Sequence, residues 1–385
     1  MTEYSNQRST GGAERRPASG GANHGRKMSA KQRQARKRRK MIIFAIEIIV
    51  ILAMITILYL VMTKTNSEGP KSPENWPQDQ DGLEIQETVV ENETMKGYMN
   101  IALFGVDAQT DKDLYKGSRS DSIMIASINM DTGDIKLVSV YRDTYLNIGT
   151  DEYIKCNHAY AYGGAEQAVK MLNMNLDMDI KNFVTVGYRG LSEVIDGLGG
   201  VYIDVDSEEL KHINNYQINI AEALKCDYTP VTQEGYQLLN GLQASAYCRI
   251  RYTKGDDFKR ATRQREVLKA IEAQAKKADL ATLSKVFDNV VDDVYTSLEP
   301  KDILDLIGNI SKYQIVDEGG FPEETMRTTA NIGAKGSSVI PMDLESNVVW
   351  LHQFLFDDQS YTVTDNVKEY GQKIKADTTP YINKN

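Results

Sequence analysis

The sequence predicts an α/β or α+β sandwich built on a central sheet, preceded by one transmembrane helix. From Gly97 onward, short apolar runs typical of buried strands alternate irregularly with segments of helical spacing. Before them, residues 41–62 form an apolar stretch that follows a basic N-terminal segment. At 385 residues the chain allows one large domain or two of ordinary size.

Residues 1–40 are strongly basic and contain few large apolar side chains. They hold 12 Lys and Arg against 2 Asp and Glu. Such a segment cannot bury enough surface to fold alone, so we expect a disordered tail. The rest of the chain holds 33 basic and 52 acidic residues, and an acidic body argues against general nucleic-acid binding.

Residues 41–63 are predicted to cross a membrane as an uncleaved signal anchor. As a helix the apolar stretch spans roughly 33 Å, enough for a bilayer core. A cleaved signal peptide is the competing interpretation, but its apolar region is typically ~7–15 residues long, and no small-residue cleavage site follows here. The positive-inside rule places residues 1–40 in the cytoplasm and the body outside the cell membrane. The role of Glu47, inside the apolar stretch, is open.

Residues 64–96 are acidic, polar and proline-containing, and are expected to form an extended extracellular linker. A folded domain is then expected over residues 97–357, followed by a loose polar tail over 358–385. Strands are expected at 98–105, 122–129, 135–141, 183–187 and 201–205. Helices are expected at 164–176, 191–195, 233–245, 263–277, 280–291 and 300–311, with further packed segments at 339–344 and 348–356.

The segment Tyr247–Gln264, YCRIRYTKGDDFKRATRQ, concentrates arginines in this acidic body. Arg249 and Arg251 alternate around Ile250, so a strand would point both guanidinium groups to the same face. Such groups match phosphate oxygens in bidentate geometry. The segment therefore predicts a phosphate-binding surface.

A helix is expected to begin after Gly255 and to add further phosphate ligands. Arg260, Arg263 and Gln264 have the i, i+3, i+4 spacing that places side chains on one helix face. A helix N-terminus also attracts anions. For Arg263 and Arg265 the alternative is an ordinary solvent-exposed helix face.

Arginines and aspartates also occur in pairs at the ends of expected strands. Arg119 and Asp121 precede one strand, and Arg142 and Asp143 follow another. Asp107 follows a third strand, and ligand sites of open α/β sheets lie where such loops meet. Each pair alone is more often a structural ion pair. Together they predict a pocket for a polyanion with a hard divalent cation, whereas the cysteines and histidines show no zinc-type spacing.

Six motifs occur in a fixed order along the chain. They are GVD (105–107), SRSDSI (118–123), SVYRDTY (139–145), NHAYAYGG (157–164), LGGV (198–201) and RIRY…DFKRATRQREV (249–267). Over residues 98–275 this arrangement resembles the LytR-CpsA-Psr family of cell-wall enzymes. The resemblance implies an α/β/α sandwich with a central mixed sheet and an apolar tunnel for a lipid tail. It also implies that a glycopolymer, of teichoic acid or capsular polysaccharide type, is transferred from a polyprenyl diphosphate carrier to peptidoglycan.

The resemblance assigns roles to individual residues. It implies a Mg²⁺ site, with Mn²⁺ as the alternative metal, at Asp107 and Asp121. Two departures from the family pattern are Tyr141, where the family commonly has proline, and Lys259, where it commonly has glycine. The residues implied to bind pyrophosphate are Arg119, Arg142, Arg249, Arg251, Arg260 and Gln264, and the catalytic candidates are Arg142, Asp143 and Asp121.

The expected chemistry is phosphotransfer, in which a sugar hydroxyl of peptidoglycan attacks the phosphorus that carries the glycopolymer. The general base is left open between Asp107, Asp121 and Asp143. One alternative is a hydrolase that uses water on the same lipid diphosphate. The other is a non-enzymatic, membrane-bound regulator of transcription or the cell envelope. Anionic membrane lipid is the simpler partner for the basic tail, and no nucleic-acid partner is expected.

Overall fold

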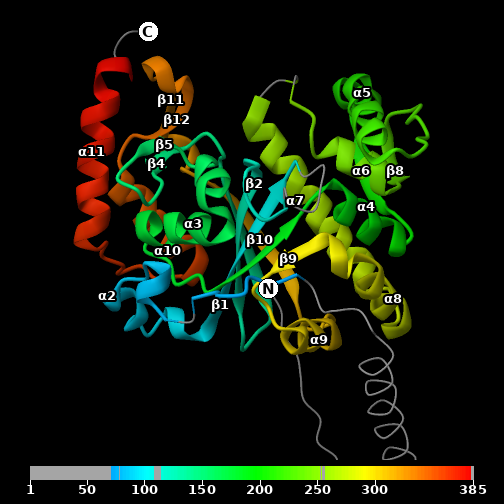
Figure 1. Cartoon of the computed structure of the whole chain (residues 1–385), viewed down its shortest axis with the longest axis horizontal. Helices are drawn as coiled ribbons and strands as arrows, with labels where there is room; N and C mark the ends of the chain where they lie inside the picture. Colours follow the sequence, from blue (N-terminus) through cyan, green and yellow to red (C-terminus); the bar gives the residue numbers. More distant parts are fainter. Residues whose placement is uncertain (1–70, 78, 108–113, 252, 254–255, 383–385) are drawn as a thin grey trace, which may run out of the picture. The chain divides into compact units, whose positions relative to one another are not determined.

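The body of the protein is a six-stranded mixed sheet with helices on both faces (Figure 1). The computed structural model describes residues 71–77, 79–107, 114–251, 253 and 256–382. The strand order is β10-β3-β2-β1-β6-β9. Strands β1 and β6 pair in parallel, as do β10 and β3, whereas the other neighbours pair antiparallel. The predicted central mixed sheet with flanking helices is therefore confirmed.

The central strands are β1 (Tyr98–Val106), β2 (Ser120–Asn129), β3 (Asp134–Val140), β6 (Asn182–Val186), β9 (Val294–Thr296) and β10 (Gln314–Phe321). Three small antiparallel pairs join β4 (Tyr145–Asn147) to β5 (Tyr153–Lys155), β7 (Val201–Val205) to β8 (Gly235–Leu239), and β11 (Arg327–Asn331) to β12 (Ser337–Pro341). The α-helices are α2 (Glu87–Val90), α3 (His158–Leu176), α4 (Tyr188–Gly197), α5 (Ser207–Leu224), α6 (Gly241–Tyr247), α7 (Asp256–Ala275), α8 (Leu280–Val290), α9 (Pro300–Gly308), α10 (Leu344–Phe356) and α11 (Asp365–Ile382).

The first three strands form a meander that sets the geometry of the site. The β2–β3 turn is stabilised by Asn129, whose side chain accepts hydrogen bonds from the backbone N–H groups of Asp131 and Thr132. Gly133 in the same turn has a φ of 83°, a conformation that favours glycine. Because β1 and β3 both run antiparallel to β2, their carboxyl ends lie at the same edge of the sheet as the start of β2.

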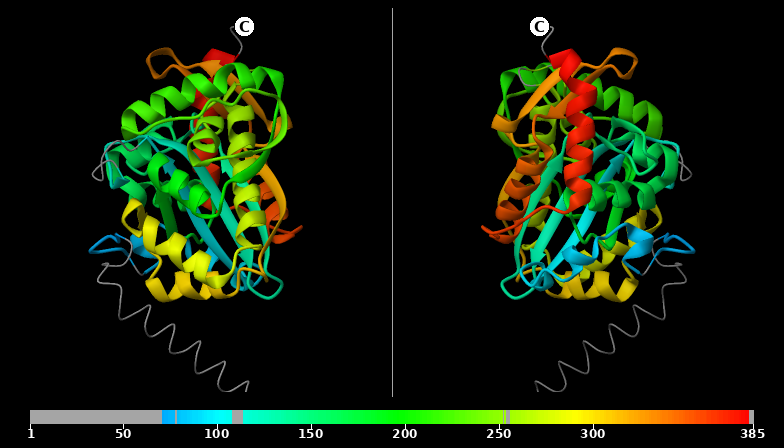
Figure 2. Two further views of the ribbon diagram at one scale, coloured as in Figure 1. Left: turned by 90° about the vertical axis from the view of Figure 1, so that its right-hand side faces the viewer. Right: turned by 90° about the vertical axis from the view of Figure 1, so that its left-hand side faces the viewer.

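Helices α3, α10 and α11 share the largest apolar core with the sheet, and they group on one side of it in Figure 1. A second core joins α4, α5 and α6 with α7 and the β7–β8 pair. Figure 2 shows α11, in red, running along the side of the body away from α8. The sheet thus separates a main core from a smaller one that borders α7.

Both ends of the described chain differ from the sequence prediction. Residues 71–96 are not an extended linker, because Leu83, Val89 and Met95 are buried in the main core. Residues 358–382 are not a loose tail, because α11 buries Val367 and Ile374 in that core. Both segments bury a few well-spaced apolar side chains within a mostly polar sequence.

The region before α7 also differs from the prediction. The expected helix over 233–245 is the strand β8 followed by the short helix α6. Residues 248–251, expected as a strand, form an irregular connection after α6. In the described part of the chain no helix is long and apolar enough to cross a bilayer. The predicted tail and anchor at residues 1–63 lie outside the described residues.

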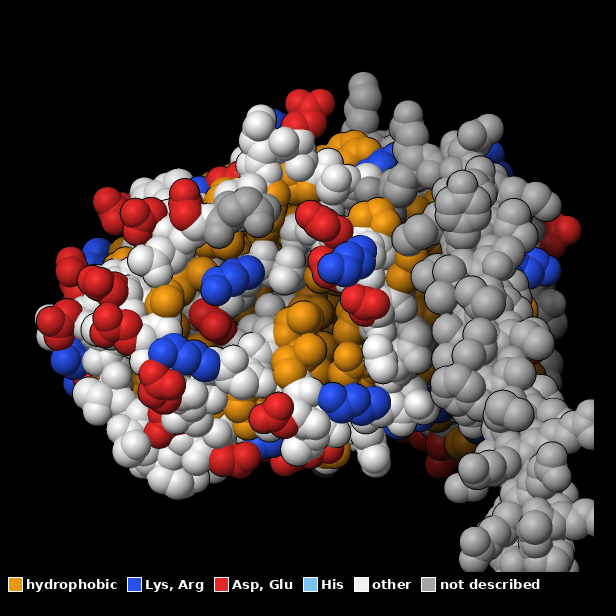
Figure 3. Space-filling view, turned by 90° about the horizontal axis from the view of Figure 1, so that it is seen from below, with side chains coloured by type: hydrophobic (Ala, Val, Ile, Leu, Met, Phe, Trp, Pro, Cys, Tyr) orange, Lys and Arg blue, Asp and Glu red, His pale blue; other side chains and the backbone are white. Residues whose placement is uncertain are grey.

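A small apolar cluster lies between the sheet and α9. Ile101 and Ile128 pack there against Ile303 and Leu306 of α9. Viewed from below, where α9 lies in Figure 1, hydrophobic side chains gather near the centre of the face between charged ones (Figure 3). None of the side chains of α9 is fully buried, so this helix covers the sheet only in part.

Candidate functional site

The strand ends bring the predicted aspartates and Arg142 to one cavity. Asp107 follows β1, Asp121 is the second residue of β2, and Arg142 follows β3. All three line a cavity of about 740 Å³. Their convergence, predicted from their positions beside apolar runs, follows from the antiparallel order of β1, β2 and β3.

A β-bulge turns Asp121 toward this cavity. Gly105 pairs with Ser122 and Val106 pairs with Ser120, so Asp121 is the extra residue opposite β1. A bulge leaves its extra residue out of the ladder and redirects its side chain, and such bulges often lie beside active sites. The irregular pairing therefore explains how a strand residue joins the loop residues in the site.

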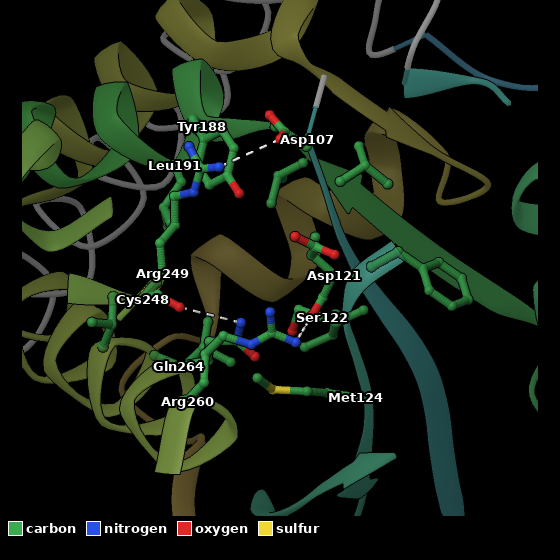
Figure 4. Close-up of a pocket in the computed structure, with 18 of the residues that line it drawn as sticks. Asp107, Asp121, Ser122, Met124, Tyr188, Leu191, Cys248, Arg249, Arg260 and Gln264 are labelled. Carbon is green, nitrogen blue, oxygen red and sulfur yellow. Dashed lines mark hydrogen bonds and ion pairs between the residues drawn. The ribbon is translucent and has the colours of Figure 1, made fainter. Parts of the chain in front are cut away.

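The segment from α6 to α7 supplies the opposite wall. Arg249 and Arg251 lie in the connection, and Arg260 and Gln264 lie one turn apart on α7. All four line the cavity, although Arg249 and Arg251 are not on the strand that was predicted. Figure 4 shows Asp121 on one side of the open space and Arg260 on the other.

Asp121 is surrounded by guanidinium groups. Its Oδ1 lies 2.5 Å from Nη1 of Arg142, and its Oδ2 lies 3.8 Å from Nη2 of Arg251. Arg260 donates from Nη2 to the backbone oxygen of Asp121 at 3.1 Å. Burial raises the pKa of Asp121, but three guanidinium groups outweigh it and hold this pKa below its usual value. The carboxyl is therefore ionised at neutral pH.

Asp257 is a site residue that the sequence analysis did not identify. Its Oδ1 lies 3.2 Å from Arg260, 3.4 Å from Arg251 and 3.9 Å from Arg142. It thus offsets the mutual repulsion of three arginines. In the sequence, only the i, i+3 spacing from Asp257 to Arg260 indicates that Asp257 could pair with a site arginine. The contacts of Asp257 with Arg142 and Arg251 arise only in the folded chain.

Arg260 is the most deeply buried of the cavity arginines, with 4% of its surface exposed. Burial lowers the pKa of Arg260 to about 10, with Arg142 and Arg251 adding to the effect and Asp257 opposing it. It therefore remains charged at neutral pH.

Arg249 lies at a separate edge of the cavity with Asp107 and two tyrosines. Its Nη2 is 3.5 Å from Oδ2 of Asp107. Its guanidinium lies 4.6 Å from the ring centre of Tyr188 and 6.0 Å from that of Tyr216, within the range of cation–π attraction. Figure 4 shows Arg249 reaching past Tyr188 to Asp107. The rings thus orient a cation toward the carboxylate.

The far part of the cavity is apolar. Helix α7 continues the face of Arg260 and Gln264 with Val267, Leu268 and Ile271, which have the i+3, i+4 and i+7 spacing from Gln264. The opposite apolar wall comes from the sheet and α4, and comprises Leu103, Val106, Met124, Val184, Val186, Leu191 and Val194. The cavity therefore combines a cationic end with an apolar end, and suits an amphiphilic anion.

Two predicted site residues lie outside the large cavity. Arg119 is exposed in the loop before β2 and is not a lining residue. Asp143 lies behind Arg142, 3.8 Å from its Nε and 3.4 Å from Nζ of Lys155, beside a small crevice. Asp143 therefore contacts Arg142 from outside the large cavity and does not line it.

Arg263 and Arg265 are buried, so the solvent-exposed alternative for them is wrong. Arg263 is 0% exposed and binds Glu209 at 2.7 Å. Arg265 is 7% exposed and donates to Oγ of Ser139 at 2.7 Å. Both side chains point away from the cavity and fasten α7 to neighbouring elements.

Asp107 and Asp121 fit a hard divalent cation by the chemistry of their donors. Both are carboxylates in the same cavity, and Mg²⁺ is commonly bound through one or two carboxylates together with substrate phosphates. Within the described part of the chain, no group of three or more His, Cys, Asp or Glu side chains is placed to hold a metal ion.

A comparison with known protein families finds a match over most of the chain. A model of the LytR_cpsA_psr family matches residues 59–347. The polyisoprenyl-teichoic acid--peptidoglycan teichoic acid transferase TagU of Halalkalibacterium halodurans is 31% identical over 234 residues, covering 57% of this chain and 70% of the relative. The corresponding TagT of Bacillus subtilis is 29% identical over 227 residues, covering 58% of this chain and 67% of the relative.

The fold has solved counterparts as well. The crystal structure of B. subtilis TagV superposes with a TM-score of 0.55 at 25% identity, covering 70% of this chain and 99% of that one. The family match extends over most of the described body, including the strand ends, the arginine segment and α7. The chain therefore belongs to the LytR-CpsA-Psr family.

Proposed function

We propose that this chain is a Mg²⁺-dependent phosphotransferase that moves a glycopolymer from a polyprenyl diphosphate carrier to peptidoglycan. One observation carries the proposal: a single cavity has arginines at one end and apolar side chains at the other. A polyprenyl diphosphate has the same division, with two phosphates joined to a hydrocarbon chain. The names of the similar TagU and TagT proteins describe this type of transfer.

In the proposed complex the diphosphate lies among Arg142, Arg251 and Arg260, and the hydrocarbon lies along α7. Guanidinium forks bind phosphate oxygens in bidentate geometry and neutralise charge that develops in the transition state. Asp257 and Asp121 hold these forks in place before the ligand arrives. Little covalent chemistry falls to the protein, so positioning and charge neutralisation provide most of the rate enhancement.

The reaction replaces the phosphoanhydride bond of the diphosphate by a phosphoester bond to the acceptor. An acceptor hydroxyl oxygen attacks the phosphorus that bears the glycopolymer, the bond to the bridging oxygen breaks, and polyprenyl phosphate leaves. The hydroxyl proton passes to a carboxylate that lines the cavity, Asp107 or Asp121. Asp107 and Asp121 would hold Mg²⁺, which when bound neutralises phosphate charge as a Lewis acid.

The activity can be tested with purified full-length chain, a synthetic polyprenyl diphosphate carrying a short glycan, a peptidoglycan fragment and Mg²⁺. Arg142→Ala or Arg251→Ala should lower kcat/KM by about 10²–10³-fold, the usual effect of removing one charge-stabilising donor. Arg189→Ala is the matched control, because Arg189 is exposed, pairs with Asp293 at 3.9 Å and does not line the cavity. Full activity in both cavity variants would refute the assignment.

The same assay separates the alternatives. A hydrolase would release the glycan phosphate equally well with and without the peptidoglycan fragment, whereas a transferase needs the acceptor to form the new phosphodiester. A regulator without enzymatic activity would give neither product. Deleting residues 1–35 should leave transfer intact, because the proposed chemistry lies wholly in the folded body.

We also propose that residues 41–63 anchor the body outside the cell membrane. The proposal rests on the length and apolarity of this stretch and on the basic residues before it. Protease added to intact cells should digest the body and leave a membrane-bound N-terminal fragment. A body protected until the cells are lysed would contradict this orientation.

A further inference from the structure

Arg327, on β11, lies directly behind the arginines of the cavity. Its guanidinium carbon is 4.1 Å from the ring centre of Phe258 and 4.8 Å from that of Tyr141. The two rings meet edge to face, with centres 4.7 Å apart and planes at 89°. Nη1 of Arg327 also donates to Tyr141 Oη at 3.3 Å and to the backbone oxygen of Pro322 at 3.0 Å. One cation therefore holds two aromatic rings from distant parts of the chain.

Each ring belongs to a residue that lies close in sequence to an arginine of the cavity. Tyr141 directly precedes Arg142, and Phe258 lies between Asp257 and Arg260 on α7. Tyr141 and Phe258 share a small cluster with Ala261 and Val339. A displacement of either residue would therefore also move the backbone that carries a cavity arginine.

The surrounding backbone is shaped to accept the Tyr141 ring. Gly320 on β10 lies against it, and a Cβ at this position would collide with the tyrosine hydroxyl. The backbone N–H of Tyr141 donates to Phe321 O at 3.0 Å, which fixes the end of β3 against β10. Tyr141 stands where the resembled family commonly has proline, so this ring contact is a feature of the present sequence.

The cavity arginines need such support. Arg142, Arg251 and Arg260 converge on Asp257 and Asp121, and like charges at short range repel one another. Without firm backing, mutual repulsion would spread their guanidinium groups apart. The rings of Tyr141 and Phe258, held by Arg327 on the side away from the cavity, resist this separation of the guanidinium groups. They do so without adding a carboxylate, which would compete with phosphate for the arginines.

We propose that Arg327 is a positioning residue for the phosphotransfer site. It clamps Tyr141 and Phe258 together and thereby keeps Arg142 and Arg260 aimed at the diphosphate. The inference rests on the proposed function, because it concerns the arginines assigned there to the ligand. Arg327 itself does not line the cavity.

The first test measures binding of geranylgeranyl diphosphate to the full-length chain by isothermal titration calorimetry. Arg327→Met keeps an apolar stem of similar length but removes the cation, and should weaken binding about tenfold through loss of two cation–π contacts. In the transfer assay the same variant should lose kcat as well as affinity, because the arginines also stabilise the transition state. Arg327→Lys retains a cation over the rings and should recover part of the loss.

Lys335→Met is the matched control. Lys335 lies 4.8 Å from the ring centre of Tyr145 and donates to its hydroxyl at 2.6 Å, but this contact lies away from the cavity. It should cost stability and leave diphosphate affinity and kcat unchanged. A general loss of cation–π packing would affect both variants equally, whereas a positioning role affects Arg327 alone.

A double-mutant cycle with Phe258→Leu isolates the clamp. If Arg327 acts through the Phe258 ring, Arg327→Met should cause little further loss in the Phe258→Leu background. Losses that simply multiply, or an Arg327→Met variant with parental affinity and kcat, would overturn the proposal. If Arg327→Met does not fold, Arg327→Lys and Tyr141→Phe provide the test instead. Tyr141→Phe removes only the hydroxyl that accepts a hydrogen bond from Arg327. Failure of the parent chain to bind geranylgeranyl diphosphate would instead refute the proposed function.

Discussion

The buried ion pair between Arg263 and Glu209 provides the most direct test of how the site is supported. Arg263 is 0% exposed, and the side chain of its partner is 2% exposed at a separation of 2.7 Å. Arg263 also donates to Ile250 O at 3.1 Å and to Thr253 Oγ1 at 2.8 Å. It therefore ties α7 to the start of α5 and to the connection that carries Arg251.

Replacing Arg263 by Met removes the cation while preserving most of the side-chain volume. Glu209 would then be a buried charge without its partner, which typically costs ~3–5 kcal/mol of unfolding free energy. At roughly 2 °C per kcal/mol for a large domain, Tm should fall by about 6–10 °C. Adding Glu209→Gln should recover at least about 2 kcal/mol, because the amide oxygen can still accept the hydrogen bond from the Asp206 N–H.

Urea unfolding followed by far-UV circular dichroism measures the loss of unfolding free energy in Arg263→Met and its recovery in the double variant. Arg189→Met is the control, since its exposed pair with Asp293 should contribute less than ~1 kcal/mol. A cost below about 1 kcal/mol for Arg263→Met would show that the pair does not stabilise the fold. A double variant as unstable as the two single losses added together would show that the two charges act independently.

Two further predictions concern other parts of the body. Burial lowers the pKa of His352 to about 4, below its unfolded value of roughly 6.5. The unfolded chain therefore binds more protons between these values, so stability should fall by up to about 3 kcal/mol as the pH drops from ~6.5 to ~4. His352→Phe should lose this slope in urea titrations at several pH values, and an unchanged slope would contradict the cause. Ile374→Ala in α11, at a residue that is 1% exposed, should cost about 2–5 kcal/mol in the same assay. The exposed neighbour in Lys375→Ala should cost almost nothing, and equal small effects would mean that α11 does not belong to the cooperative fold.

The sequence alone predicted several features that depend on residues close together in the chain. Apolar runs identified four of the six central strands, β1, β2, β3 and β6, but not β9 and β10. Polar residues beside the identified strands, after β1 and β3 and at the start of β2, identified Asp107, Arg142 and Asp121. The boundary between β8 and α6 was also available locally, because Asn240 and Gln243 form a capping box that marks a helix start.

The remainder depended on contacts between residues far apart in the chain. Arg263 lies in a charged sequence typical of a solvent-exposed face, and its partner Glu209 is 54 residues away. Asp257 gains its role from Arg142, which belongs to another element. α11 was missed because its composition is polar, although Val367 and Ile374 already had the seven-residue spacing of a buried helix face.

Helix α7 has a consequence for how deeply a ligand can enter. Arg260 and Ile271 lie on one rigid rod about 16 Å apart, and the change from polar to apolar lining falls within one turn after Gln264. A ligand displaced by one turn, about 5.4 Å, would press hydrocarbon against guanidinium groups or phosphate against aliphatic side chains. The helix therefore fixes how far a ligand enters the cavity, because the junction between its diphosphate and its hydrocarbon chain must lie beside the turn after Gln264. This position does not depend on the total length of the hydrocarbon chain.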